Sequence, residues 1–126
     1  MDKKRANAKY SDGKKNVELE VSIFLWEEDA IFYVYAPALD LTGYGLSREE
    51  ARQSFETVLE EFLVYTHNKK TIFKELENLG WAVNKKKKRV ISPDFEDMLA
   101  ENEHFKHLYK SKDLERDSSN VHLELA

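Results

Sequence analysis

The sequence contains no cysteine, and it has only four glycines and two prolines among its 126 residues. The absence of cysteine excludes disulfide bonds, thiolate metal ligands and thiol nucleophiles, and with them several classes of enzyme. No run of about 18 apolar residues is present, so no segment is predicted to span a bilayer. The polar first 15 residues lack the apolar region of a signal peptide. We therefore expect a cytoplasmic protein.

The composition predicts one folded domain with a strongly charged surface. Hydrophobic residues make up 41% of the chain and charged residues 35%, as in a globular protein. A chain of this length is sufficient for one core of ordinary size. We predict a flexible basic N-terminus (1–16), an α+β domain (17–92) and a C-terminal segment (93–126) with a helix, a polar linker and a final strand.

The net charge of −4 conceals a segregation of charge along the chain. Residues 1–16 carry six basic and two acidic side chains (+4), and residues 67–89 carry eight and two (+6). Residues 17–66 carry two basic and eleven acidic side chains (−9), and residues 90–126 carry four and nine (−5). Acidic surfaces attract basic proteins, whereas basic surfaces attract phosphates. The blocks therefore predict different partners.

Hydrophobic periodicity predicts two antiparallel strands in the acidic block. From Val17 to Leu25 every second residue is apolar, as in a half-buried strand. An acidic turn at residues 27–29 leads to a β-branched and aromatic run at residues 31–35. Pro37 should end this second strand because proline cannot donate to a central ladder.

The segment that follows predicts a third strand and a long helix. Residues 41–44 should form the strand, with Gly43 and Gly45 supplying turn conformations closed to other residues. Ser47 and Glu50 form a capping box before an apolar stripe at helical spacing. The stripe consists of Ala51, Phe55, Val58, Leu59, Phe62 and Leu63. The predicted fold class is α+β, an antiparallel β-meander (β-β-β-α-β) covered by a long helix.

The second half of the chain predicts further helices and a terminal strand. A helix over residues 71–79 should end at Gly80, which is placed as a C′ stop. Residues 81–84 and 89–91 read as two short strands around a lysine-rich turn.

The C-terminal segment should begin with a helix that Ser92 and Pro93 open as N-cap and first residue. Residues 111–120 are polar and predicted to be mobile. Residues 121–125 alternate again, which predicts a final strand.

The stretch FYVYAPALDLTGYGLSREEARQSFETVLEEFL resembles the HicB-like antitoxin family, and the resemblance covers residues 17–66. The shared features are a strand that ends in proline, a short turn with glycines and serine, and an acidic and alanine-containing helix start. The matching positions are Tyr33, Pro37, Leu39, Gly43, Gly45, Ser47, Glu50 and Ala51. Later, RVISPDF is similar to the strand plus proline that often closes this domain. The resemblance implies a partly degraded ribonuclease-H-like core that binds and blocks a small double-stranded-RNA-binding-like toxin.

We therefore predict a protein-binding module of the HicB-like antitoxin type, not an enzyme, that neutralises a small basic RNase-like toxin without any cofactor. Aromatic residues beside a rigid turn make good interface anchors, and carboxylates attract a basic partner. The predicted partner-binding residues are Tyr35, Pro37, Leu39, Asp40 and Tyr44; the aromatic and aliphatic ones could equally fill a small core. Unpaired strand edges predict a homo-oligomer, a dimer or a higher even-numbered assembly.

The alternative is a stand-alone nucleic-acid-binding protein. Lys85, Lys86, Lys87, Lys88 and Arg89 concentrate five cations at a hairpin tip, where they could grip phosphates while Trp81 stacks a base. The same residues are also compatible with a solvated turn that protects a sheet edge, and with Trp81 in the core.

A third hypothesis is a degenerate ribonuclease-H-like hydrolase. Asp40 could join Glu18, Glu20 and Asp29 around a divalent metal, but such a site needs carboxylates that converge on the ion. The spacing favours a turn residue and a solvated strand face instead. We therefore predict no catalytic residues.

A zinc site is the remaining metal hypothesis. His104 and His107 are three residues apart on a predicted helix, near Glu101 and Glu103, so both imidazoles could reach one ion. Nothing in the sequence supplies the rest of the coordination shell. We therefore predict exposed histidines and no metal.

Overall fold

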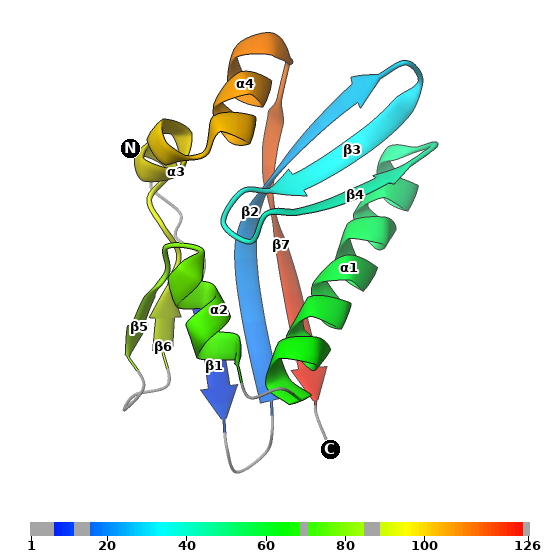
Figure 1. The fold of residues 1–126 in the computed structure, drawn as a ribbon. Helices are drawn as coiled ribbons and strands as arrows, with labels where there is room; N and C mark the ends of the chain where they lie inside the picture. Colours follow the sequence, from blue (N-terminus) through cyan, green and yellow to red (C-terminus); the bar gives the residue numbers. More distant parts are fainter. Residues whose placement is uncertain (1–6, 12–15, 69–70, 85–88, 125–126) are drawn as a thin grey trace.

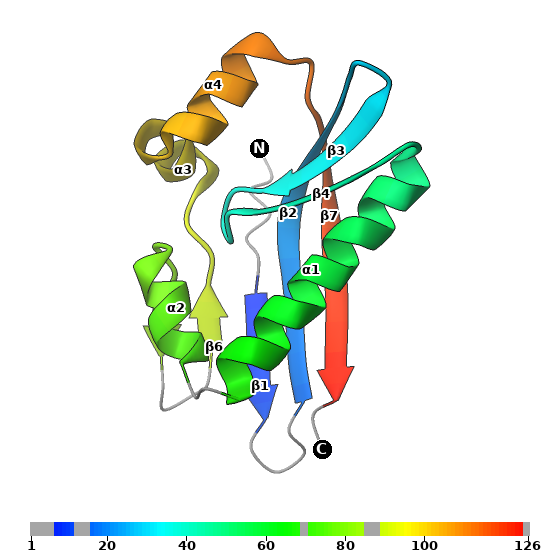
Figure 2. The same ribbon diagram turned by 45° about the vertical axis from the view of Figure 1, so that its right-hand side comes forward.

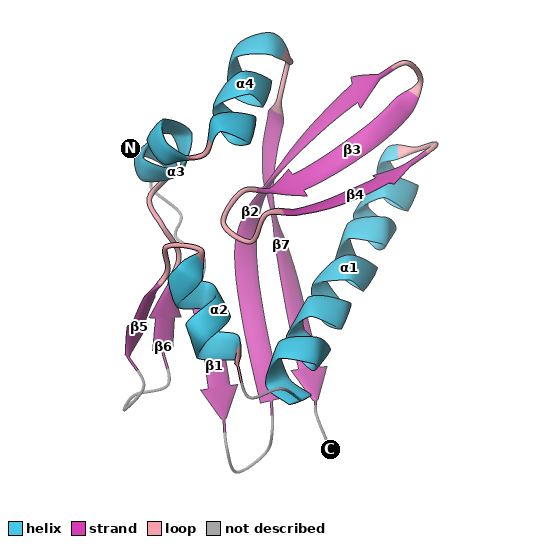
Figure 3. Ribbon diagram, in the orientation of Figure 1, coloured by secondary structure: helices cyan, strands magenta, loops and turns pink. Residues whose placement is uncertain are grey.

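The computed structural model describes residues 7–11, 16–68, 71–84 and 89–124. These residues form four helices and one seven-stranded sheet, so the fold is α+β as predicted (Figure 1, Figure 3). The strands are β1 (Asn7–Ser11), β2 (Asn16–Glu28), β3 (Ile31–Ala36), β4 (Leu41–Gly45), β5 (Ala82–Asn84), β6 (Arg89–Ile91) and β7 (Glu115–Glu124). The helices are α1 (Arg48–Asn68), α2 (Ile72–Asn78), α3 (Phe95–Glu101) and α4 (Glu103–Ser111). None of these helices is long and apolar enough to cross a membrane.

The predicted meander and its covering helix are confirmed. β2, β3 and β4 pair as antiparallel neighbours, and α1 follows them. Asp29 and Ala30 both have positive φ and form the tight turn between β2 and β3, a geometry that matches the twist of a hairpin. Pro37 follows the last residue of β3, where its missing N–H removes no ladder hydrogen bond.

β2 is the centre of the sheet because three strands pair with it. β7 runs antiparallel to residues 16–25 along one edge of β2. The other edge is shared, since β1 pairs with residues 16–19 and β3 with residues 24–28. In the described part of the chain, residues 20–23 of β2 therefore have a strand neighbour on the β7 side alone. The sheet divides there into one arm with β3 and β4 and another with β1, β6 and β5 (Figure 1).

α1 covers one face of the β3–β4 arm through the predicted apolar stripe. Its fully buried residues are Ala51, Phe55, Leu59 and Leu63. Gly43 lies so close to the helix that a Cβ atom there would be 2.3 Å from the backbone nitrogen of Phe55. The prediction that Gly43 and Gly45 supply turn conformations is wrong, because both lie within β4 and neither has positive φ. They are needed because only a residue without a side chain lets the helix approach this strand.

The start of α1 confirms half of the predicted capping box. The Oγ atom of Ser47 accepts a hydrogen bond from the amide of Glu50 at 3.1 Å. The Glu50 carboxylate, however, accepts from the amide of Leu46 at 3.2 Å and not from that of Ser47. Both bonds hold the chain at the first turn, so the helix begins directly after Ser47 as predicted.

α3 and α4 cover the opposite face of the sheet with aromatic side chains. The ring centroid of Phe24 lies 4.9 Å from that of Phe105 and 6.1 Å from that of Phe95. Tyr35 also contacts Phe105, with a centroid separation of 6.4 Å. Since α1 covers the other face, the middle of β2 is buried on both sides: Ile23 and Phe24 are both almost inaccessible to solvent.

The sequence predicted one C-terminal helix opened by Ser92 and Pro93, and the structure corrects this. α3 begins at Phe95, and a break at Asn102 separates it from α4. The rings of Phe95 and Phe105 meet edge to face at 5.7 Å. In one straight helix these residues would be about 15 Å apart along the axis, so the break is what brings them together on the sheet.

The predicted mobile linker at residues 111–120 is also corrected, because β7 already begins at Glu115. Its polar side chains have partners on α1. Arg48 forms an ion pair with Glu115, and Arg52 forms one with Asp117 at 2.8 Å. Polar composition therefore does not imply mobility here, since the backbone of this segment pairs with β2.

Two predicted segments join the central sheet. Residues 7–11, from the N-terminus expected to be flexible, form β1, and β2 and β6 pair with it on its two sides. β7, from the predicted C-terminal segment, pairs with β2. The predicted N-terminal, central and C-terminal segments therefore share one sheet.

A candidate binding cleft

A cleft of about 550 Å³ lies between the β3–β4 loop, the end of α2 and the junction of α3 with α4. Its apolar lining comes from Pro37, Leu79, Gly80, Pro93 and Met98. Its polar lining comes from Asp40, Asn78, Asp97, Glu101, Asn102, Glu103 and His104. Four of these lining residues are carboxylates and none is lysine or arginine, so the lining is acidic and partly apolar.

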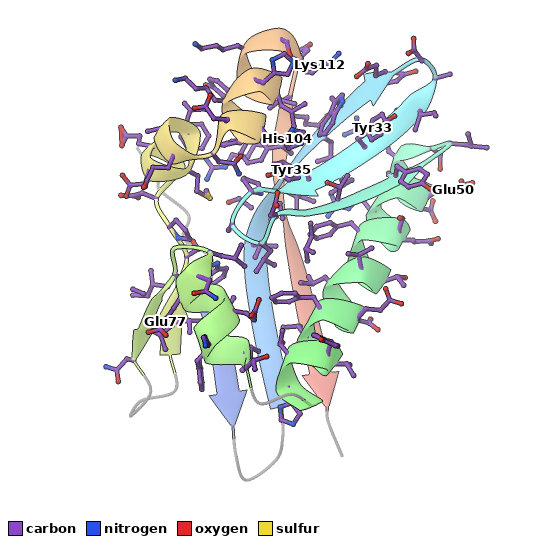
Figure 4. The ribbon with its side chains drawn as sticks, in the orientation of Figure 1. Tyr33, Tyr35, Glu50, Glu77, His104 and Lys112 are labelled. Atoms are coloured by element: carbon purple, nitrogen blue, oxygen red, sulfur yellow. The ribbon has the colours of Figure 1, made fainter. Side chains whose placement is uncertain are left out.

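Asp40 is held in the cleft wall by a buried hydroxyl group. The Tyr35 hydroxyl donates a hydrogen bond to Oδ1 of Asp40 at 2.8 Å and accepts one from Nδ2 of Asn102 at 3.0 Å. Burial raises the pKa of the Tyr35 phenol far above its ordinary value; the Asn102 bond lowers it, and Asp40 raises it further. Tyr35 is therefore a neutral donor at physiological pH. Figure 4 shows it beneath α4.

Asn102 joins this network to the helix junction. Its Oδ1 atom accepts the amide hydrogen of Phe105 at 3.0 Å and thereby caps α4. Its Nδ2 group points the other way, to Tyr35. One side chain thus fixes both the start of α4 and the phenol that orients Asp40.

Two further hydrogen bonds hold the loop that carries Asp40. Nε1 of Trp81 donates a hydrogen bond to the carbonyl oxygen of Ala38 at 2.7 Å, and the amide of Leu39 bonds to Ala36 at 3.1 Å. Asp40 itself has a φ of 55°, in the left-handed region that Asp tolerates better than most residues. Trp81 is only 4% exposed, so it supports this loop and is not available to stack a base.

Gly80 forms the part of the cleft wall that ends α2. Its φ of +95° confirms the predicted glycine stop after this helix. The position is also crowded, since a Cβ atom there would be 3.3 Å from Cγ of Pro93. The positive φ therefore favours glycine, and a larger residue would in addition require Pro93 to shift slightly.

The predicted partner-binding residues do not form one surface. Pro37 and Asp40 line the cleft. Tyr35 and Leu39, at 1% and 2% exposure, belong to the core and cannot anchor a partner directly. Tyr44 is 66% exposed but lies on β4, outside the cleft.

Tyr44 belongs instead to a row of aromatic side chains across three strands. Trp26, Tyr33 and Tyr44 occupy directly paired positions on β2, β3 and β4. The rings of Trp26 and Tyr33 stack at 5.2 Å, and those of Tyr33 and Tyr44 lie 6.5 Å apart. Such cross-strand pairs stabilise the register of the meander.

The residues that were weighed as metal ligands or as nucleic-acid contacts lie in several places. Glu18 and Glu20 lie in β2 and Asp29 in the turn that follows it, whereas Asp40 lies in the cleft. Within the described ranges, no group of three or more histidine or acidic residues could hold a metal ion. Arg89 begins β6, while Lys85, Lys86, Lys87 and Lys88 lie outside the described residues.

The two histidines that were weighed as zinc ligands, His104 and His107, are exposed residues of α4. His104 packs edge-on against the ring of Tyr35 at 5.0 Å, and Figure 4 shows the two residues next to each other at the lower end of α4. The carbonyl oxygen of His107 accepts a hydrogen bond from Ser111. Glu101 and Glu103, which lie near these histidines in the sequence, line the cleft together with His104.

Sequence reasoning missed Asp97 and Asn102 as residues of this site. Asp97 carries no signal in the sequence, because its place in the cleft depends on how α3 packs. Asn102 did carry one: asparagine is a preferred N-cap residue, and reading it as such would have separated the two helices. Comparison of the chain with known protein families, curated proteins and solved structures finds no match. The resemblance to the HicB-like family therefore stays a prediction.

Proposed function

We propose that this protein is a HicB-like, antitoxin-type binding module that neutralises a small basic RNase-like protein, and that the cleft receives a lysine or arginine side chain of that partner. The observation that carries the proposal is that four carboxylates, those of Asp40, Asp97, Glu101 and Glu103, line one cleft together with apolar residues. Pro37 and Asp40 were already predicted to bind the partner, from the rigid turn and from the acidic charge of this block.

The cleft suits a long basic side chain in both of its parts. Lysine and arginine carry an apolar stem and a cationic head, and they bury the stem wherever apolar surface is available. Pro37 and Met98 would contact the stem, while Asp40 and Glu101 would pair with the cation. Charge-assisted hydrogen bonds to carboxylates are about twice as strong as neutral ones.

α1 would add long-range attraction for the same partner. Its glutamates are exposed to solvent, and they are Glu49, Glu50, Glu56, Glu60 and Glu61. Its two arginines, Arg48 and Arg52, point to β7 and form ion pairs there. The helix thus presents acidic groups outward and keeps its cations at the sheet, an arrangement that accelerates encounter with a basic protein.

The binding step can be tested with a blocked tetrapeptide that contains one arginine among glycines, and with a matched peptide that has norleucine in place of arginine. In a titration followed by amide NMR shifts of the full chain, we expect the arginine peptide to perturb residues 37–40 and 97–104. Asp40→Asn and Glu101→Gln should each weaken binding about tenfold.

Glu56→Gln is the matched control, because it removes the same charge from the exposed face of α1. It should leave the peptide affinity within about twofold. Equal losses in all three variants would show that general acidity, and not the cleft, attracts the peptide. Equal binding of the norleucine peptide would contradict the proposed role of the carboxylates.

The antitoxin role needs a separate test against a ribonuclease. A small basic protein encoded next to this gene is the partner to try first. We expect the full chain to inhibit its RNA cleavage, and Asp40→Asn to inhibit less. If a neighbouring basic ribonuclease is neither bound nor inhibited by the wild-type chain, the antitoxin proposal is wrong.

A further inference from the structure

The outer edge of β7 is the longest unpaired strand edge in the described part of the chain. The edge of β4 is closed, because the amide of Tyr44 donates to Oγ of Ser54 on α1 at 3.2 Å and Gly43 contacts the same helix. β5, at the far border, has three residues. β7 has ten, and no described strand pairs with its outer side (Figure 2).

The first half of this edge is occupied by α1. Nη2 of Arg52 donates a hydrogen bond to the carbonyl oxygen of Ser118 at 3.2 Å. The amide of Ser118 donates to the Asp117 carboxylate at 2.8 Å. Both main-chain groups of Ser118 therefore point away from β2 and already have partners.

Among the described residues, no strand pairs with the outer side of the second half of the edge. In an antiparallel strand, the residues whose amide and carbonyl both point to one side recur at every second position. Since Ser118 points outward, Asn120, His122 and Glu124 also direct their main-chain groups outward. α1 crosses the first half of β7 and then runs toward β1, as Figure 2 shows, so the helix leaves the second half of this strand.

We propose that this open half of β7 pairs with β7 of a second copy of the chain, antiparallel and about a two-fold axis at His122. In this register Asn120 pairs with Glu124 of the second copy, His122 pairs with its own equivalent, and Glu124 pairs with Asn120. All three open residues are then used on each copy, which gives six main-chain hydrogen bonds. A shift of the axis by one residue to Val121 would place Glu124 opposite Ser118, whose groups already have partners.

A second copy fits this edge because the edge lacks the usual features that prevent self-association. Exposed edges are commonly protected by lysine, proline or a bulge. Residues 119–124 contain neither lysine nor proline, and the β7 register with β2 continues through ten pairs without a bulge. Glu124 is the one carboxylate of this segment, so two copies bring little charge together. Among the described residues that line the cleft, none belongs to β7, and this inference does not depend on the proposed function.

Sedimentation of the full chain over a wide range of concentrations tests the proposal. We expect a shift from the 14.8 kDa monomer toward twice that mass as concentration rises. His122→Pro removes an outward N–H without touching the β2 ladder, so it should weaken dimerisation at least about tenfold and leave the melting temperature of the monomer unchanged. A wild-type chain that stays monomeric at millimolar concentration would overturn the proposal.

Val121→Pro is the matched control, because Val121 has the opposite parity and its N–H points to β2. It should lower the melting temperature, which His122→Pro should not. A large loss of stability in His122→Pro with none in Val121→Pro would show that the outward residues are assigned to the wrong parity.

The register can be tested separately, since the natural chain has no cysteine. A single cysteine in His122→Cys would lie about 5.5 Å, Cα to Cα, from its equivalent, within the range that a disulfide can bridge. In Ser118→Cys the two cysteines would be about 27 Å apart. With copper phenanthroline as oxidant, we expect covalent dimers from the first variant and almost none from the second. Equal cross-linking of both would contradict the two-fold axis at His122.

Discussion

The two faces of the central meander are packed in different ways. On the α1 face, the helix backbone at Phe55 packs directly against Gly43, and this close packing depends on the absence of a side chain at Gly43. On the α3–α4 face, the aromatic core continues into a hydrogen-bonded group of Tyr35, Asp40 and Asn102 that ends at the cleft. The difference indicates that the first face mainly stabilises the fold and that the second also positions groups for recognition. Substitutions on the two faces should therefore have separable effects.

Phe55→Ala should have the largest effect on stability. Phe55 is 1% exposed and lies at the point where α1 meets β4, so its removal leaves a cavity that the helix cannot close. We expect a loss of about 3–5 kcal/mol in the free energy of unfolding, measured by calorimetry or urea denaturation. The exposed neighbour Glu56→Gln is the control. An unchanged melting temperature in Phe55→Ala would show that this face does not carry the stability of the fold.

Gly43→Ala should be nearly as damaging, although it adds a single methyl group. The new Cβ atom would be 2.3 Å from the Phe55 nitrogen, and that atom belongs to a helix backbone that cannot move alone. We expect a loss of about 3 kcal/mol. Thr42→Ala, at the exposed neighbouring position, should change stability by less than about 1 kcal/mol. Similar losses in both variants would indicate a general sensitivity of β4 and not a close approach.

Tyr35→Phe should separate recognition from stability on the second face. The change removes one hydroxyl, leaves the ring in place, and deprives Asp40 and Asn102 of their shared partner. We expect a loss of about 1 kcal/mol in stability. Binding of the arginine peptide should weaken several-fold, because Asp40 is no longer oriented. Unchanged binding would show that Asp40 does not need this support.

The raised pKa of Tyr35 predicts a dependence of stability on pH. The phenol titrates near pH 10 in the unfolded chain and at higher pH in the folded one, so above about pH 10 only the unfolded state releases this proton. The stabilisation is complete below pH 10 and declines as pH rises beyond it. Comparison of urea midpoints for wild type and Tyr35→Phe should show the gap between them narrowing above pH 10. A gap that does not change with pH would argue against a buried, protonated phenol.

The order of elements could be predicted because most segments show a single clear period. The alternation from Val17 to Leu25 fits only a strand, and the apolar stripe around Phe55 fits only a helix. Residues 115–120 could not be read in this way, since their polarity reflects pairing with Arg48 and Arg52, which are far away in the sequence. Gly43 was misread because a glycine needed for close approach looks the same in sequence as one needed for a turn.

The cleft could be predicted only in part. Pro37 and Asp40 were singled out from the rigid turn and its charge, and both line it. Asp97 and Leu79 come from segments whose meeting depends on tertiary packing, and no local pattern encodes it. Tyr35 and Leu39 share the local pattern of Pro37, but the strand pleat and the loop turn their side chains inward, where the core covers them.

The sheet divides at β2 into two arms, and residues from both arms line the cleft. Pro37 and Asp40 belong to the arm of β3 and β4, whereas Leu79 and Pro93 flank the hairpin of the other arm. β7 pairs with residues 16–25 of β2 and so spans the division of the sheet. The hydrogen bond from Trp81 to Ala38 links the arm of β5 and β6 to the β3–β4 loop. Between its two arms, β2 therefore has a single strand neighbour at residues 20–23 in the part of the chain that the structure describes, and that neighbour is β7.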